Sequence, residues 1–144
     1  MIAIDSNILI YAHRQDSKWH KPALRSIESL ITQSGFWAIT WPSVHEFISI
    51  ATHPRVYSPP STLQQAIAQM DLWMSAPSIR VLGETSVHWE ELKAISLAGQ
   101  IIGPPIHDAR IAAICMQHGV SELWTADRDF SRFPKLKTRN PLVG

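Results

Sequence analysis

The segment MIAIDSNILIYA, residues 1–12, contains two apolar runs separated by a short polar stretch that opens with an aspartate. Its first four residues are all apolar, which is typical of a strand buried on both faces of a parallel sheet. The second run, from Ile8 to Tyr11, predicts a helix directly after this strand. Asp5 would then lie at the carboxyl end of a central strand, where open α/β sheets concentrate ligand binding and catalysis. A carboxylate is expensive to desolvate in such apolar surroundings, so Asp5 needs backbone donors, a cation or a metal as its partner.

Length and composition limit the class of protein. A chain of 144 residues suits one domain, residues 1–144, whose hydrophobic core is large enough to fold without disulfide bonds or structural metal ions. Lys and Arg number 13 against 12 for Asp and Glu, which gives a net charge of +1. This charge argues against a strongly basic surface that binds nucleic acid, so any nucleic-acid contact is local. Cys115 is the only cysteine, which excludes disulfides within the chain and multi-cysteine metal sites. With no signal peptide and no apolar run near the roughly 18 residues of a membrane span, we expect a cytoplasmic protein.

Strand-like and helical patterns alternate along the rest of the chain. Short apolar or β-branched runs predict strands at residues 37–41, 79–82 and 122–125, with an edge strand at 136–138. Helical spacing of apolar residues predicts helices at 19–34, at 43–52, from a Ser61 cap to Pro77, from a Thr85 or Ser86 cap to about Ala98, and from His107 to a stop at 118–119. Strands that alternate with helices imply parallel pairing through right-handed crossovers. The sequence therefore predicts a three-layer α/β/α sandwich around a short parallel sheet.

Four acidic residues fall at one edge of the predicted sheet. Asp5 and Asp127 follow the first and fourth strands, Glu46 lies one turn into the helix after the second strand, and Asp108 opens a helix buried against the sheet. Carboxylates brought together in one crevice repel, and an oxygen-rich cluster without Cys or His suits Mg²⁺ or Mn²⁺. The matching chemistry is phosphoryl transfer to water, in which one or two metal ions activate the water and stabilise charge on the phosphate oxygens.

Each of these acids also has a purely structural interpretation. Ser43-x-x-Glu46 has the spacing of a capping box, and Asp5 can cap the first helix. Asp108 can complement a helix dipole, and Asp127 can be an ordinary turn residue. Taken singly, these interpretations are as good as a metal site or better. Taken together, the structural interpretations explain the four acids less well than a metal site does, because capping does not require the acids to share one edge of the sheet.

The ordered set of motifs resembles the PIN-domain nucleases, and most closely the VapC-type toxins of bacterial toxin–antitoxin pairs. The motifs that carry the resemblance are Asp5-Ser6-Asn7, Glu46 in His-Glu-Phe, His107-Asp108-Ala109, Thr125-Ala126-Asp127-Arg128-Asp129-Phe130, Arg132-Phe133-Pro134 and Arg139-Asn140-Pro141. The resemblance implies a PIN-like fold and a Mg²⁺- or Mn²⁺-dependent endoribonuclease whose catalytic residues are Asp5, Glu46, Asp108 and Asp127. It also implies a homodimer, and a cognate antitoxin that covers the active-site groove.

Roles within the site follow from this assignment. Asp5, Asp108 and Asp127 are expected to hold the metal directly or through water, and Glu46 either to be a further ligand or to orient the attacking water. Asn7 and Thr125 are expected to donate hydrogen bonds that fix the orientation of these carboxylates. Asp129 is a further supporting candidate, since the last motif offers two aspartates and the family's fourth acid best matches Asp127. Five basic residues near the C-terminus are candidates for binding RNA phosphates, with surface solvation as an equal alternative: Arg128, Arg132, Lys135, Lys137 and Arg139.

Two other functions remain open. The same acidic site suits a non-toxin nuclease or a phosphatase, although an aspartyl-nucleophile phosphatase would need an aspartate where Asn7 stands. A catalytically inactive RNA-binding domain is the second alternative. Apolar stripes fit dimer or antitoxin surfaces, or else plain core, and contain Met70, Trp73, Trp89 and Leu92. The seven histidines show no zinc-ligand spacing.

Overall fold

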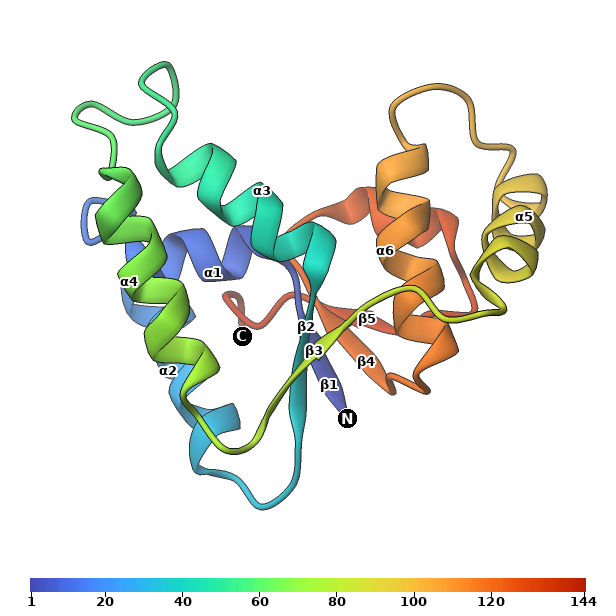
Figure 1. Ribbon diagram of the computed structural model, residues 1–144, viewed down its shortest axis with the longest axis horizontal. Helices are drawn as coiled ribbons and strands as arrows, with labels where there is room; N and C mark the ends of the chain where they lie inside the picture. Colours follow the sequence, from blue (N-terminus) through green and yellow to red (C-terminus); the bar gives the residue numbers. More distant parts are fainter.

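The computed structural model describes all 144 residues and has a five-stranded sheet at its centre (Figure 1). The strand order is β3-β2-β1-β4-β5, and every pair of neighbours is parallel. The strands are β1 (Ile2–Ile4), β2 (Trp37–Thr40), β3 (Ile79–Leu82), β4 (Glu122–Trp124) and β5 (Thr138–Arg139). The apolar run before Asp5 is therefore the central strand, as the sequence predicts.

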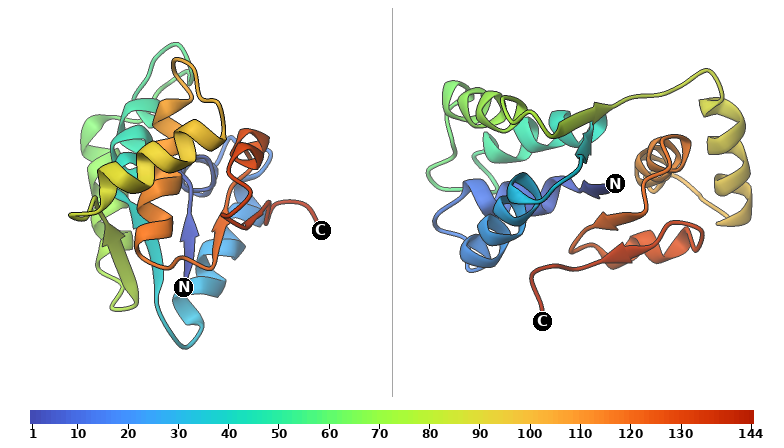
Figure 2. Two further views of the ribbon diagram at one scale, coloured as in Figure 1. Left: turned by 90° about the vertical axis from the view of Figure 1, so that its right-hand side faces the viewer. Right: turned by 90° about the horizontal axis from the view of Figure 1, so that it is seen from below.

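Helices cover both faces of the sheet, so the molecule has three layers (Figures 1 and 2). Helices α1 to α4 lie on one face, and α6 lies on the other with α5 packed against it. The helices are α1 (Ser6–His13), α2 (His20–Thr32), α3 (Trp41–Ala51), α4 (Leu63–Met74), α5 (His88–Ala98), α6 (Ile106–Gln117) and the short 3₁₀ helix η1 (Arg128–Arg132). The predicted α/β/α architecture is confirmed.

Successive residues of the central strands pack into two different cores. Ala3 belongs to the core beneath α6, whereas Ile4 belongs to the core beneath α1 to α4. Ala38 and Ile39 of β2 repeat this alternation. Because both faces are covered, the strands read as continuous apolar runs and not as alternating ones. Three fully buried alanines let α6 approach the sheet closely: Ala109, Ala112 and Ala113.

Helix α3 begins at Trp41 and not at Ser43, and the strand before it ends at Thr40 and not at Trp41. Thr40 is the N-cap of the helix, and its hydroxyl oxygen accepts a hydrogen bond from the Ser43 N–H at 3.3 Å. Pro42 therefore lies in the first helical turn, where no intrahelical hydrogen bond is lost. The strand predicted at 37–41 therefore ends one residue earlier, and the helix predicted at 43–52 begins two residues earlier.

Other predicted boundaries are also wrong. Neither Thr85 nor Ser86 caps α5, since its N-cap is Val87 and no side chain caps it. Helix α4 is capped by Thr62 and not by Ser61: the Thr62 hydroxyl accepts from the Gln65 N–H at 3.0 Å, and the Gln65 side chain accepts from the Thr62 N–H at 2.9 Å. Strand β5 begins only at Thr138, the last residue of the predicted range 136–138, and Leu136 is instead buried in the core beneath α6. None of the helices combines the length and the apolar character that a membrane span requires.

Candidate active site

Asp5 is a buried carboxylate at the carboxyl end of β1, only 3% exposed. It caps α1, since its Oδ1 accepts a hydrogen bond from the Ser6 N–H at 2.8 Å. Its Oδ2 accepts from the Thr125 hydroxyl at 2.8 Å and from the Asn7 side-chain amide at 3.2 Å. In spite of these donors, burial raises the pKa of Asp5 to about 6, and repulsion from neighbouring carboxylates adds to the rise. Asp5 therefore has hydrogen-bond donors but no cationic partner.

Asn7 and Thr125 join the start of α1 to the end of β4. The Asn7 side-chain amide donates to Thr125 Oγ1 at 3.2 Å, and its carbonyl oxygen accepts from the Ala126 N–H at 3.1 Å. Thr125 Oγ1 also accepts from the Asp127 N–H at 3.0 Å. The hydroxyl that donates to Asp5 therefore also fixes the backbone of Asp127. This is the arrangement expected of residues that orient carboxylates from two strands.

Glu46 does not form the capping box that its spacing from Ser43 allows. Ser43 is not the N-cap of α3, since Thr40 has that position. Instead, Glu46 Oε1 accepts a hydrogen bond from the hydroxyl of Ser6, the first residue of α1. The capping-box interpretation of Glu46 is therefore wrong. Sequence reasoning missed the Ser6 hydroxyl, because the two residues are 40 positions apart and no local spacing signals their contact.

Three aspartates meet above the same edge of the sheet. Ligand oxygens of Asp108, Asp127 and Asp129 lie within 4.8 Å of one another. Asp108 lies in the first turn of α6, and Asp127 caps η1 by accepting a hydrogen bond from the Asp129 N–H at 2.8 Å. Burial raises the pKa of Asp108, and the charges of Asp127 and Glu46 raise it further. Asp129 lies within the cluster although the sequence makes it only a supporting candidate.

The chemistry of this donor set fits a hard divalent cation. The cluster offers carboxylate oxygens and neither thiolate nor imidazole, which is the preference of Mg²⁺ and Mn²⁺. Asp5 is outside the group of three, but its pKa and that of Asp108 are both raised by neighbouring carboxylates. Mutual repulsion of this kind is relieved by a divalent ion. The residues present are therefore suited to holding a metal.

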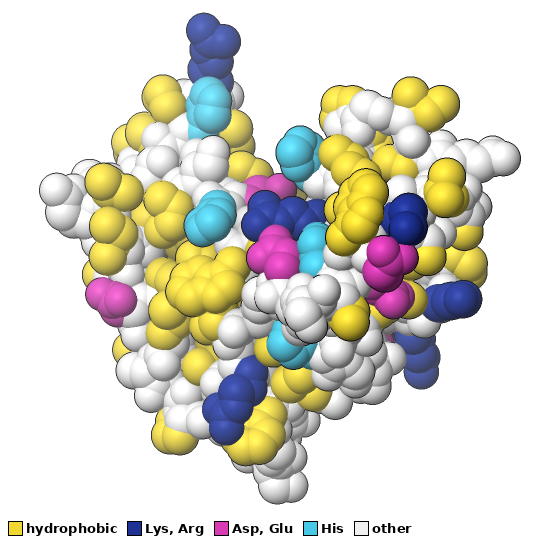
Figure 3. Space-filling model, turned by 45° about the vertical axis from the view of Figure 1, so that its right-hand side comes forward, with side chains coloured by type: hydrophobic (Ala, Val, Ile, Leu, Met, Phe, Trp, Pro, Cys, Tyr) yellow, Lys and Arg dark blue, Asp and Glu magenta, His cyan; other side chains and the backbone are white.

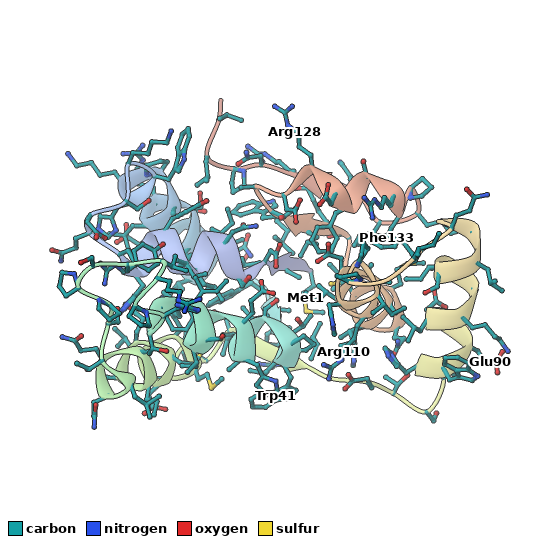
Figure 4. The ribbon with its side chains drawn as sticks, turned by 90° about the horizontal axis from the view of Figure 1, so that it is seen from above. Met1, Trp41, Glu90, Arg110, Arg128 and Phe133 are labelled. Atoms are coloured by element: carbon teal, nitrogen blue, oxygen red, sulfur yellow. The ribbon has the colours of Figure 1, made fainter.

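The basic residues predicted to bind RNA divide into two groups. Two are already engaged: Lys137 pairs with Glu122 at 3.4 Å, and the Arg139 guanidinium lies 5.6 Å from the centre of a tryptophan ring. Arg128 projects outwards from η1 (Figure 4) and lines a hollow of about 250 Å³ together with Asp127 and Arg139. Three of the five are exposed and form no ion pair: Arg128, Arg132 and Lys135.

The molecular surface has two lobes with a notch between them (Figure 3). Acidic, basic and histidine side chains gather at and below the base of this notch. The largest cavity, about 690 Å³, lies elsewhere and contains none of the candidate acids; its lining includes His13, Arg14, Ser61 and Gln69. The candidate chemistry therefore belongs to the carboxyl edge of the sheet and not to the largest hollow.

The apolar stripes considered as partner surfaces separate into core and surface. Met70 and Trp73 are buried in the core beneath α4. Trp89 of α5 is 64% exposed, and Leu92 packs partly against the core beneath α6. Of these four side chains, only Trp89 is exposed.

Comparison with known proteins gives one consistent family. The PIN domain family model matches residues 2–136. The VapC ribonuclease Mb2897 of Mycobacterium bovis is 31% identical over 144 residues, which are 100% of this chain and 97% of the relative. Ribonuclease VapC48 of Mycobacterium tuberculosis is 26% identical over 140 residues, 97% of each chain.

Solved structures agree with this family at the level of the fold. Mycobacterium tuberculosis VapC20, described as a sarcin-ricin loop cleaving toxin, has a TM-score of 0.68 at 16% identity, covering 91% of this chain and 93% of that one. VapBC2 from Rickettsia felis, bound to a DNA fragment from its promoter, has a TM-score of 0.66 at 19% identity, covering 96% and 98%. With a family model that spans nearly the whole sequence and a full-length relative at 31% identity, the chain belongs to the PIN domain family.

Proposed function

We propose that this PIN-domain protein is a Mg²⁺- or Mn²⁺-dependent endoribonuclease that hydrolyses RNA phosphodiester bonds and is the toxin of a type II toxin–antitoxin pair. The observation that carries the proposal is the convergence of acidic side chains from separate segments at one sheet edge. Full-length relatives that are named ribonucleases support RNA as the substrate class. Residues 1–144 would form a single nuclease domain.

The acids divide the catalytic work. Asp5, Asp108 and Asp127 would hold the metal, directly or through water, and Glu46 would be a further ligand or would orient the attacking water. When bound, the ion supplies a water of lowered pKa and stabilises charge on the phosphate oxygens. Asp129 is close enough to Asp108 and Asp127 to support the same ion. Asp5 is held for this role by hydrogen bonds to both of its carboxylate oxygens.

RNA phosphates would be bound by cations beside these acids. The hollow that contains Asp127 is lined by two arginines, so a phosphate bound there would lie next to the carboxylate cluster. Burial and neighbouring carboxylates raise the pKa of Asp108, and the nearby guanidinium of Arg132 partly opposes this rise, which supports a position for Arg132 beside the cluster. Because the net charge of the chain is only +1, its affinity for RNA would depend on the basic residues near the C-terminus. These residues are Arg128, Arg132, Lys135, Lys137 and Arg139.

Two protein partners belong to the proposal: a second copy of this chain, and a cognate antitoxin that covers the active-site groove. The VapBC2 structure from Rickettsia felis supports an antitoxin partner by its fold similarity. Large apolar side chains at the surface support a protein contact, since exposed aromatic residues are enriched at interfaces. Exposed examples at the start of α3 and around α5 are Trp41, Val87, Trp89 and Leu97, at 43%, 56%, 64% and 75%. The cytoplasm is the expected compartment, because RNA is the proposed substrate.

Cleavage of total RNA tests the nuclease. Wild-type protein, Asp108→Asn and the control Asp71→Asn, at an exposed position of α4, are each incubated with EDTA, Mg²⁺ or Mn²⁺ and resolved on a denaturing gel. Discrete metal-dependent products are expected from the wild type and the control, and none from Asp108→Asn. Duplex DNA as substrate distinguishes the proposed endoribonuclease from a DNA nuclease, and p-nitrophenyl phosphate distinguishes it from a phosphatase. RNA binding without cleavage by folded wild-type protein would refute the nuclease and leave a binding domain.

Growth of a bacterial host tests the toxin. Production of the chain without an antitoxin is expected to arrest growth, and Asp108→Asn is expected to relieve the arrest. Normal growth with active wild-type enzyme in the cells would leave a nuclease that is not a toxin.

A further inference from the structure

Ser6 connects Asp5, the N-cap of α1, with Glu46 of α3. Its backbone N–H donates to Asp5 Oδ1 at 2.8 Å, and its hydroxyl donates to Glu46 Oε1. Ser6 is 1% exposed, so bulk water does not compete for this hydroxyl. A single residue therefore fixes two carboxylates relative to one another.

Glu46 has no other contact that would hold its carboxylate. It lies at an exposed position of α3, forms no ion pair, and accepts no hydrogen bond at Oε2. An exposed glutamate otherwise samples several rotamers, and ordering it costs side-chain entropy. The Ser6 hydroxyl occupies Oε1, selects one orientation of the carboxylate, and leaves Oε2 free for a cation or a water molecule.

Ser43 shows what a purely structural serine does at this edge. It is also fully buried, in the first turn of α3. Its hydroxyl accepts a hydrogen bond from Thr40 Oγ1 at 3.1 Å, three residues away, and contacts no acid. Serine hydroxyls at helix starts usually bond to such local groups. The Ser6 hydroxyl bonds to no local group and reaches a carboxylate on another helix, so helix capping does not explain it.

We infer that Ser6 is a positioning residue that acts through Glu46, holding its carboxylate in the orientation used for metal binding and hydrolysis. The inference rests on the proposed nuclease function. Removing a partner that orients a metal-site carboxylate typically lowers metal affinity or activity by about 10- to 100-fold. Ser6→Ala removes only the hydroxyl, whereas Ser6→Thr retains it. The loss is expected in Mn²⁺ affinity and in kcat, with KM for RNA unchanged, because Ser6 is buried away from the bound strand.

The test compares Ser6→Ala, Ser6→Thr and the matched control Ser43→Ala. Mn²⁺ affinity is measured by isothermal titration calorimetry, and kcat and KM are measured on a fluorescent single-stranded RNA chosen from the wild-type cleavage sites. Ser6→Ala is expected to bind Mn²⁺ about tenfold more weakly. Ser6→Thr is expected to restore most of the affinity. Ser43→Ala is expected to shift the unfolding midpoint without changing Mn²⁺ affinity.

A double-mutant cycle tests whether Ser6 acts through Glu46. If it does, Ser6→Ala combined with Glu46→Gln binds Mn²⁺ no more weakly than Glu46→Gln alone, because the two effects are not additive. Additive losses would overturn the inference, and so would wild-type Mn²⁺ affinity in Ser6→Ala or the absence of Mn²⁺ binding by the wild type.

The titrations also separate this inference from the proposed function. One outcome is that the wild type binds Mn²⁺ but cleaves no RNA, while Ser6→Ala binds Mn²⁺ about tenfold more weakly than the wild type. That outcome would refute the nuclease function and would still support the positioning of Glu46 by Ser6. Should Ser6→Ala fail to fold, Ser6→Cys keeps the volume with a weaker donor, and wild-type affinity in that variant would overturn the inference.

Discussion

Asparagine in place of Asp5 removes a buried charge and leaves the helix cap in place. The pKa of Asp5 is raised from 3.8 to about 6 in the folded protein. A rise of about two units corresponds to about 3 kcal/mol of destabilisation at a pH above both values. Because the folded state holds this proton more tightly, the free energy of unfolding falls as the pH rises from about 4 through about 6. The Asp5→Asn variant should not show this fall in the free energy of unfolding, because asparagine does not titrate.

The substitution also disturbs the hydrogen bonds around the carboxylate. Asparagine caps a helix as well as aspartate does, so the bond from the Ser6 N–H survives. The new amide nitrogen, however, replaces Oδ2, which accepts from the Thr125 hydroxyl and the Asn7 amide. The hydroxyl can rotate, but one Asn7 hydrogen loses its acceptor, which costs about 1–2 kcal/mol. Without metal, Asp5→Asn should therefore be about 1–2 kcal/mol more stable than the wild type at pH 8.

Urea denaturation in EDTA at pH 4 and pH 8, followed by circular dichroism, measures this difference. At pH 4 the wild-type carboxyl is largely protonated, so the variant should be no more stable than the wild type. The advantage should thus appear only at the higher pH, and Asp71→Asn should show no such dependence. Mn²⁺ at pH 8 should stabilise the wild type and not Asp5→Asn. Equal destabilisation of Asp5→Asn at both pH values would refute the reasoning and leave capping as the role of Asp5.

Three other substitutions test the core, the hydrogen-bond network and the RNA surface. Trp73→Ala should lower the free energy of unfolding by about 3–5 kcal/mol because the side chain is 4% exposed, whereas Leu72→Ala, at 67% exposure, should change it by less than about 0.5 kcal/mol in the same urea titration. Thr125→Val removes a bond that lowers the pKa of Asp5, so the fall of stability with pH should extend to a higher pH; an unmoved profile would show that the bond is unimportant. Arg128→Ala should raise KM for RNA several-fold and reduce the slope of log affinity against log salt by about one, and an unchanged slope would place the RNA elsewhere.

The position of Asp5 could be predicted because its signals are local. An apolar run that ends in an acid indicates a buried strand and the edge at which it stops. The parallel sheet order then brings the ends of β1 and β4 together, so Asp127 follows from the same reasoning. The partner of Glu46 could not be predicted in this way. Its bond with Ser6 depends on how α1 packs against α3, which no spacing along the chain records.

Helix starts show a second limit of local reasoning. The sequence favoured Ser43 and Ser61, whereas the caps are Thr40 and Thr62. Serine and threonine are both good N-caps, so residue type alone does not choose between candidates a few positions apart. The choice is made by which residue has extended backbone and an oxygen facing a free N–H. Asp129 is a similar case, because the tight turn at the start of η1 brings it beside Asp127.

Capping alone does not account for an aspartate at position 5. Asparagine or serine would accept the same hydrogen bond from the Ser6 N–H without the cost of a desolvated charge. The chain instead keeps a carboxylate whose pKa is about 6, close to other acids whose charges raise it further. A group that destabilises the metal-free fold is retained at functional sites and seldom elsewhere. If the acids hold a divalent ion, as we propose, the same repulsion strengthens its binding, and the stability lost in the metal-free protein returns when the ion binds.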